Sequence, residues 1–296
     1  LAHGMAWSGV EEVNYKGEPV PPMWRYLLAL TNTECLKAVK ARYKEFLQAF
    51  DWDGVNLAEL YFEGGSGPRS PRLYTPMHPS ARQEFARKAG FDPALLLDSL
   101  SEYFWKTNHV ALKRFEDYRV ETIARLHEEF LRMINEVKTE KPDLDVIVTA
   151  MDNLGSPELR PYFGVDMQHI FELRKQYGFT LQVEDPQSQW SMDPRRYASL
   201  GKKYQLLVGQ NHPVMVDLNI LQFRNEHIPT QFPTLIQTGI ENYHMVYSAA
   251  QQCDRFTLYA ESSIRPQDVR MLAYAASART LLSRIPGGWH IQTPSA

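Results

Sequence analysis

The sequence lacks the features that mark a membrane protein or a nucleic-acid-binding protein. No apolar run approaches the roughly 18–20 residues that a membrane-spanning helix requires. The chain has 32 basic and 35 acidic residues, a net charge of −3, and no block rich in lysine and arginine. We therefore expect no membrane span and no nucleic-acid partner.

Cysteine is scarce, since only Cys35 and Cys253 occur and they lie far apart in the sequence. Two buried free thiols are the favoured interpretation, and a single long-range disulfide is the alternative. The redox compartment therefore stays open.

Several cofactor and nucleophile motifs are absent. The chain contains no G-x-G-x-x-G, G-x-x-x-x-G-K-[ST], G-x-S-x-G or H-E-x-x-H sequence. Its nine histidines are scattered, without metal-ligand spacing. These absences argue against a nucleotide cofactor, a serine hydrolase and a zinc enzyme, and we predict no cofactor.

The length and composition fit one large globular domain. The 296 residues include 44% hydrophobic ones, enough for a sizeable core. The sequence begins at Leu1 with neither an initiator methionine nor a signal peptide. We expect a single domain over residues 1–296 that is a fragment of a longer protein.

Strand-like and helical segments alternate along the chain. Apolar runs that predict strands occupy residues 24–31, 54–58, 144–152, 179–185, 204–211, 213–219 and 255–262. Helical periodicity covers 33–50, with Thr33 as its N-cap, and 80–140, 167–178, 234–253 and 266–284.

This alternation predicts an α/β fold, a parallel sheet with helices outside it. About six βα units favour a (β/α)₈ TIM-type barrel, whose functional residues sit at the carboxyl ends of the strands. We expect residues 1–9 to form one further strand with its loop, and the first strand of the barrel would then lie upstream of Leu1.

Acidic residues recur where these strands end. Glu59, Asp152, Glu184 and Glu261 each stand at or near the end of a strand-like run, and Asp217 is a fifth candidate. Any one of them alone could be a solvated strand end or a helix cap. Gathered on one barrel rim, the carboxylates would repel each other and raise the pKa of at least one of them. Glycoside hydrolysis uses such a set, with one protonated carboxylic acid for the leaving oxygen and one carboxylate as nucleophile or base.

One segment also resembles a known family. "DWDGVNLAEL" (51–60) is similar to the "(F/Y)DG(V/I)xxD" strand of TIM-barrel glycoside hydrolases, including hydrolase-like families that act on bacterial exopolysaccharides. "HPSARQEFARKAGFDP" (78–93) and the helix–"KP"–strand pattern of 118–150 are also similar. The resemblance implies a catalytic acid at Glu59, with Ala58 where some members carry an acid. Whether Glu59 is nucleophile, proton donor or substrate ligand stays open.

Glu59 and Glu184 are the predicted catalytic pair, with Asp152 orienting or tuning one of them. The predicted sugar-binding residues are Trp190, Asn211, His212, Asp217, Glu261 and Trp7. Residues 64–79, rich in glycine, proline and serine, leave the strand that carries Glu59, and we expect them to border the cleft.

The leading hypothesis is a glycoside hydrolase that cleaves a polysaccharide or oligosaccharide by a two-carboxylate mechanism. The alternatives are a non-catalytic carbohydrate-binding barrel, or a scaffold in a cell-surface assembly, and a barrel hydrolase that uses the same acids as metal ligands. Action on a polysaccharide would favour a secreted, periplasmic or cell-surface location. The sugar, its linkage, the stereochemical outcome and the oligomeric state stay open.

Overall fold

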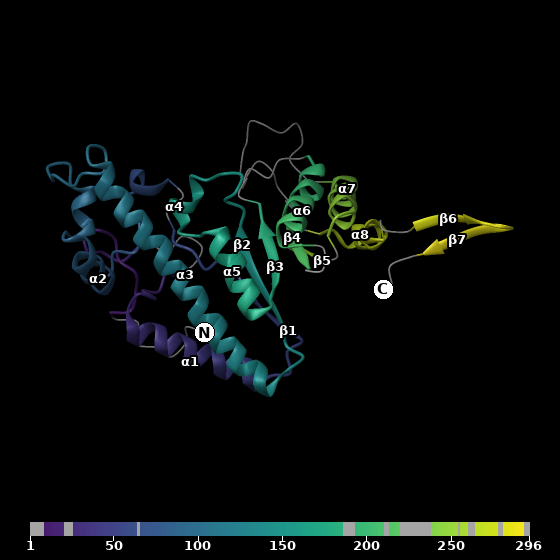
Figure 1. Ribbon diagram of the computed structural model, residues 1–296, viewed down its shortest axis with the longest axis horizontal. Coiled ribbons are helices and arrows are strands. Elements are labelled where there is room, and N and C mark those ends of the chain that lie inside the picture. The colour runs from purple at the N-terminus through teal and green to yellow at the C-terminus, as the bar shows by residue number, and fades with distance from the viewer. Residues whose placement is uncertain are drawn as a thin grey trace. The chain divides into compact units, whose positions relative to one another are not determined.

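The computed structural model describes residues 9–20, 26–63, 66–185, 193–209, 213–219, 238–253, 255–259, 264–277 and 281–292 (Figure 1). The chain divides into two compact units. The N-terminal unit comprises Leu1–Val146 and Asn153–Gly178, and the C-terminal unit comprises Ile147–Asp152 and Phe179–Ala296. The expectation of a single domain stays a prediction.

The N-terminal unit is mainly helical. Its elements are α1 (Thr33–Ala49), β1 (Gly54–Leu57), α2 (Pro79–Ala89), α3 (His109–Glu140), α4 (Leu159–Phe163) and α5 (Met167–Tyr177), with 3₁₀ turns at Gly67–Arg69 and Pro93–Leu97. The long helix α3 buries one face, on which Phe115, Ile123, Leu126 and Phe130 recur at helical spacing. This face forms the centre of the unit.

A buried cation holds the segments around α3 together. The guanidinium of Arg119 is fully buried and donates to the carbonyl oxygens of Thr75 at 2.6 Å and Tyr162 at 2.7 Å, and also to that of Pro161. Burial lowers the pKa of Arg119. Arg119 therefore supplies donors to one loop carbonyl, that of Thr75, and to two carbonyls in the last turn of the short helix α4.

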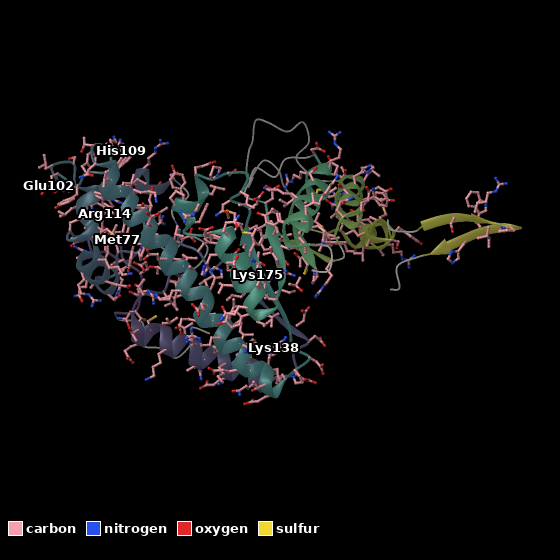
Figure 2. The ribbon with its side chains drawn as sticks, in the orientation of Figure 1. Met77, Glu102, His109, Arg114, Lys138 and Lys175 are labelled. Atoms are coloured by element: carbon pink, nitrogen blue, oxygen red, sulfur yellow. The ribbon has the colours of Figure 1, made fainter. Side chains whose placement is uncertain are left out.

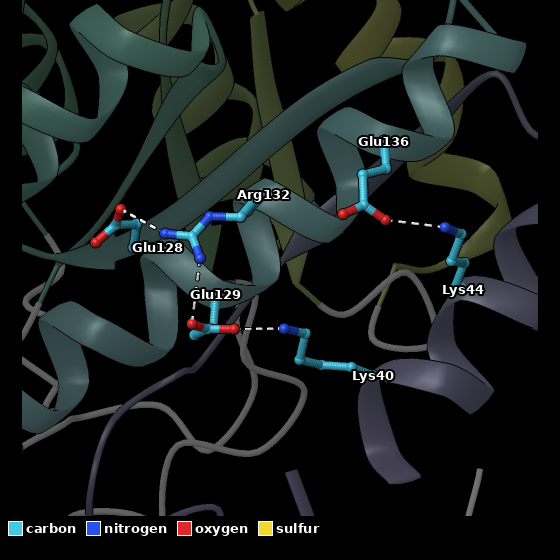
Figure 3. A network of polar contacts seen from close by, with 6 residues as sticks. All are labelled: Lys40, Lys44, Glu128, Glu129, Arg132 and Glu136. Carbon is cyan, nitrogen blue, oxygen red and sulfur yellow. Dashed lines mark hydrogen bonds and ion pairs between the residues drawn. The ribbon is translucent and has the colours of Figure 1, made fainter. Parts of the chain in front are cut away.

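Ion pairs connect α1 to α3 on the outside of this unit. Lys44 Nζ lies 2.9 Å from Glu136 Oε2, and Lys40 pairs with Glu129 (Figure 3). Arg132 bridges Glu128 and Glu129 within α3. Because most of these side chains are partly exposed, the pairs contribute little to stability.

The C-terminal unit carries most of the sheet. Strand β2 (Asp145–Met151) begins in the N-terminal unit and continues in the C-terminal one. It is followed by β3 (Thr180–Glu184), α6 (Arg195–Val208), β4 (Val214–Asn219), α7 (Gly239–Ala250), β5 (Arg255–Tyr259), a 3₁₀ turn (Pro266–Asp268), α8 (Val269–Ala276), and β6 (Leu281–Ile285) paired antiparallel with β7 (Gly288–Gln292).

The sheet has the strand order β1-β2-β3-β4-β5, and the pairs from β2 to β5 are parallel. The predicted α/β class is confirmed in the form of a five-stranded half-barrel, which is compatible with part of a TIM-like barrel. Both cysteines are buried free thiols. Within the described ranges, no helix is long and apolar enough to cross a membrane.

Four predicted elements of the N-terminal unit are corrected. Of the run 24–31, the described residues hold only one isolated bridge, between Glu11 and Leu28, and no strand. Asn32, not Thr33, caps α1, since its side chain accepts from two backbone N–H groups. Strand β1 ends at Leu57, not at Ala58. The helical region predicted over 80–140 is divided into α2 and α3, because Gly90, at φ 83°, ends α2.

Two predicted elements of the C-terminal unit are wrong in type. Residues 204–208 belong to α6, whose buried residues Tyr197, Leu200 and Tyr204 follow a helical period. The apolar run 204–211 predicted a strand because Leu206 is apolar, but Leu206 is exposed on the surface of the helix. The predicted final helix stops at Ala276, and Leu281–Ile285 is a strand whose turn contains Gly287 at φ 88°.

Candidate active site

The parallel strands of the C-terminal unit present two chemically different faces. Val183 and Val216 are paired in register, and both are fully buried. Successive side chains of a strand point to opposite faces. The residues that follow these valines, Glu184 and Asp217, therefore lie at one level on the other face of the sheet.

Asp152 lies on the face of the valines, where α6 packs. Lys203 Nζ donates to its two carboxylate oxygens at 3.0 and 2.9 Å, and the hydroxyl of Tyr204 donates to Oδ1 at 2.6 Å. Burial raises the pKa of Tyr204 far above its usual value, and the bond to Asp152 raises it further. Asp152, predicted as an orienting acid, is thus an anchor for α6.

A second acid repeats this arrangement one strand along. Asp185 Oδ2 lies 2.9 Å from Arg196 Nε, close enough for an ion pair though not aligned for a hydrogen bond. Arg196 also donates to the hydroxyl of Tyr197 at 2.7 Å. Since Arg196–Tyr197 and Lys203–Tyr204 are seven residues apart, both pairs lie on one side of α6. The sheet and α6 are joined by both acids.

The opposite face carries the other acids of the C-terminal unit. Glu184 ends β3, and the register of β3 with β4 places Asp217 beside it on the adjacent strand. The hydroxyl of Thr257, the register partner of Asp217 on β5, donates to Asp217 Oδ1 at 2.6 Å. Burial raises the pKa of Asp217, and the hydrogen bond from Thr257 opposes that rise. These three side chains form a row on the face turned away from α6.

Gln182 lies on the same face, one side-chain level before Glu184 on β3. Its side chain is only 3% exposed, and its carbonyl oxygen Oε1 has no hydrogen-bond partner within the part of the chain that the structure describes. A buried acceptor without a donor is costly, and such atoms commonly mark a ligand or water site. The face that carries this row therefore also carries a buried acceptor, Gln182 Oε1, to which a bound hydroxyl group could donate.

Glu59 belongs to the N-terminal unit and lies two residues after β1. Its φ of 56° is the one positive φ among the described non-glycine residues. A left-handed backbone at a residue with a side chain is strained, and such strain occurs often at functional sites. The segment that follows is fixed, because Phe62 N–H donates to Phe163 O at 3.0 Å and Arg119 Nη2 donates to Glu63 O at 3.4 Å.

Residues 60–63 also line a cavity of about 50 Å³ inside the N-terminal unit. Its walls are mostly apolar and include Leu27, Leu60 and Ile123, with Thr75 from the predicted border loop 64–79. Glu12 also lines it, and its Oε1 accepts from the N–H groups of Met77 at 2.8 Å and His78 at 2.9 Å. Figure 2 labels Met77. Burial raises the pKa of Glu12 to about 7.

Sequence reasoning missed Glu12, Gln182, Lys203, Tyr204 and Thr257. The spacing of Tyr197 and Tyr204 was an available signal, but it was hidden by the prediction of a strand over 204–211. To predict that Thr257 is the partner of Asp217, one must know the register of β4 with β5, and no local sequence pattern gives that register. Glu12 lies in a short polar stretch without periodicity.

Five predicted binding residues, Trp7, Trp190, Asn211, His212 and Glu261, lie outside the described residues. The structure brings Glu184 and Asp217 onto one face, and it places Asp152 on the other. Within the described ranges, no group of three or more histidine, cysteine or acidic side chains could hold a metal ion.

Comparison with known proteins gives a likeness of fold. No family model matches the chain, and no curated protein matches it. Among solved structures, the glycoside hydrolase domain of PgaB (BpsB) from Bordetella bronchiseptica is similar, with a TM-score of 0.61 and 11% sequence identity. The match covers 95% of this chain and 72% of that one. The architecture is therefore glycoside-hydrolase-like.

Proposed function

We propose that the chain is a glycoside hydrolase that cleaves a polysaccharide or oligosaccharide with two carboxyl groups, and that its half-barrel is part of a (β/α)₈ TIM-type barrel. The observation that carries the proposal is the row of Glu184, Asp217 and Thr257 at the carboxyl ends of parallel strands. Barrel enzymes place their chemistry at these ends. The likeness to a glycoside hydrolase domain supports the same function.

We propose Glu184 as one of the two catalytic carboxyl groups. It ends its strand on the face turned away from α6, whereas Asp152 is bound to α6 through Lys203. Glu59 is the second acid of the predicted pair, and its strained backbone supports a functional role. Both positions remain proposals for the enzyme's catalytic groups.

A carbohydrate-binding barrel without catalysis is the second candidate. The carbonyl oxygen of Gln182, which has no donor among the described residues, favours it, because an acceptor for a sugar hydroxyl serves binding as well as hydrolysis. Binding without cleavage would distinguish this candidate from the enzyme.

The test is to incubate the full chain with a panel of polysaccharides, bacterial exopolysaccharides included, and to measure new reducing ends. We expect cleavage of at least one polymer, and a loss of about 10³-fold or more in Glu184→Gln and Glu59→Gln with unchanged circular dichroism. Glu102→Gln, at an exposed position, is the matched control and should cleave as the wild type does. Near-normal turnover in Glu184→Gln would contradict the assignment, and saturable binding without cleavage would favour the binding barrel.

A further inference from the structure

We propose that Asp217, placed above among the sugar-binding residues, is the proton donor of the reaction, with Glu184 as the carboxyl group that works beside it. This inference rests on the proposed glycosidase function. It assigns the proton transfer to Asp217 and gives Glu59 the role of a substrate ligand, one of the three roles left open for it above, so that loss of Glu59 still lowers turnover.

The first argument is the placement of the two acids. They stand at one level on adjacent parallel strands, on the same face. Neighbouring strands lie roughly 4.8 Å apart, so their side chains start from neighbouring positions. Retaining glycosidases hold their two carboxyl groups about 5–5.5 Å apart, which adjacent strands can supply.

The second argument is the surroundings of Asp217. Thr257 donates to Oδ1, which leaves Oδ2 as the oxygen able to carry a proton. The side chain is partly buried, and burial favours the protonated form. A general acid needs a fixed orientation, which the bond from Thr257 supplies, and surroundings that favour its protonated form, which burial supplies.

The third argument comes from Gln182, which points independently to a ligand. Its buried carbonyl oxygen has no donor among the described residues, and it lies on this face one level below Glu184. A sugar bound across the row would offer hydroxyl donors to that oxygen. The two acids and Gln182 thus form a surface with both reactive and binding groups.

The chemistry follows from this placement. Asp217 transfers its proton to the glycosidic oxygen while the bond from that oxygen to the anomeric carbon breaks, and the bonding electron pair stays on the oxygen. A carboxylate oxygen of Glu184 forms the new bond to the anomeric carbon. Water then displaces Glu184 and returns a proton to Asp217, so the configuration at the anomeric carbon is retained.

The experiment compares leaving groups. Once the panel has identified a cleaved polymer, an oligosaccharide of that polymer is made with a sugar leaving group and with a 2,4-dinitrophenyl leaving group, which departs without protonation. We expect kcat/KM, which reports the step in which the leaving group departs, to fall in Asp217→Asn by about 10²–10⁴-fold on the sugar leaving group and by less than about tenfold on the dinitrophenyl one. Proton NMR of the first product should give the retained anomer.

Two matched variants sharpen the result. Asp152→Asn removes an acid from the opposite face and should affect both substrates equally. Thr257→Val removes the donor to Asp217 and should show the leaving-group dependence of Asp217→Asn in weaker form.

The outcomes separate the two proposals. Equal losses on both substrates in Asp217→Asn would overturn its role as proton donor while leaving the enzyme assignment intact. A leaving-group dependence in Glu59→Gln instead would transfer the role to Glu59. If the wild type cleaved no polymer of the panel, the proposed function itself would fail, and the donor assignment with it.

Discussion

The two units each bury a carboxyl group, and they do so in different ways. In the N-terminal unit, Glu12 is 5% exposed and accepts from the backbone N–H groups of Met77 and His78, both neutral donors. In the C-terminal unit, Asp152 is 7% exposed and receives the ammonium of Lys203 and the hydroxyl of Tyr204. Burial raises the pKa of Glu12 to about 7. The same kind of group, a buried carboxyl, is thus a titrating acid at Glu12 and part of an ion pair that holds α6 at Asp152.

The difference teaches that burial alone does not identify a functional acid. The groups that contact the carboxyl determine its charge, because desolvation disfavours the charged form while a neighbouring cation favours it. Among the described residues, the donor to Asp217 is the hydroxyl of Thr257, a neutral group like the backbone N–H groups that donate to Glu12. On this basis Asp217, rather than Asp152, has the surroundings of a general acid.

The largest expected effect is on the pH dependence of stability through Glu12. Its pKa rises from 4.5 to about 7 on folding, so its contribution is fully present below pH 4.5 and is lost as the pH rises through 7. The wild type should lose up to about 3 kcal/mol of unfolding free energy between pH 5 and pH 8 through this group. Glu12→Gln, which mimics the neutral acid, should flatten that part of the profile in denaturant unfolding experiments.

Glu102→Gln is the matched control, since it makes the same change at an exposed position of the same unit. Its profile should follow that of the wild type. A profile of Glu12→Gln that declined as steeply as that of the wild type would show that Glu12 is already ionised in the folded chain.

A smaller effect is expected when the anchor in the C-terminal unit is broken. Asp152→Asn keeps the shape and an acceptor for Tyr204 but removes the charge that Lys203 faces. Because the Lys203 side chain is 36% exposed and keeps part of its hydration, we expect a loss of about 1–2 kcal/mol. Differential scanning calorimetry should record a melting temperature several degrees lower, with a far smaller loss of activity than in Glu184→Gln.

The opposite pattern of losses would contradict the distinction drawn between Asp152 as a structural acid and Glu184 as a catalytic one. If Asp152→Asn lost activity as severely as Glu184→Gln while its melting temperature stayed unchanged, Asp152 would belong to the catalytic groups and not to the scaffold.

The sequence was sufficient for the parallel strands and for most helices. Strands β2, β3 and β4 were predicted because each is a short run of mostly apolar residues, as expected of a strand buried on both faces. Helix α6 was not predicted, and its last turns were taken for a strand, because Leu206 and Leu207 are exposed on a helix and imitate a buried strand. Local pattern cannot separate these cases without knowledge of what covers the residues.

For the site, the sequence was sufficient to identify the acids at the strand ends but not the face of the sheet on which each one lies. Glu184 and Asp185 are neighbours in the chain, yet one lies with Asp217 and the other with Arg196. Only the strand pleat and the position of α6 assign them to different sides. The strain at Glu59 was equally inaccessible, since a positive φ at a residue other than glycine has no reliable sequence signal.

The smallest expected effect concerns the exposed ion pairs that join α1 to α3. Lys44 and Glu136 have side chains that are 37% and 58% exposed, so water and salt compete with their attraction. Lys44→Met should change the melting temperature by no more than about one degree, and the difference should disappear in about 1 M salt. Lys203→Met makes the same substitution in front of a buried carboxylate, and its larger effect should persist in salt because Asp152 is shielded from counterions. Equal shifts in the two variants would mean that burial of the acid partner does not set the strength of these pairs.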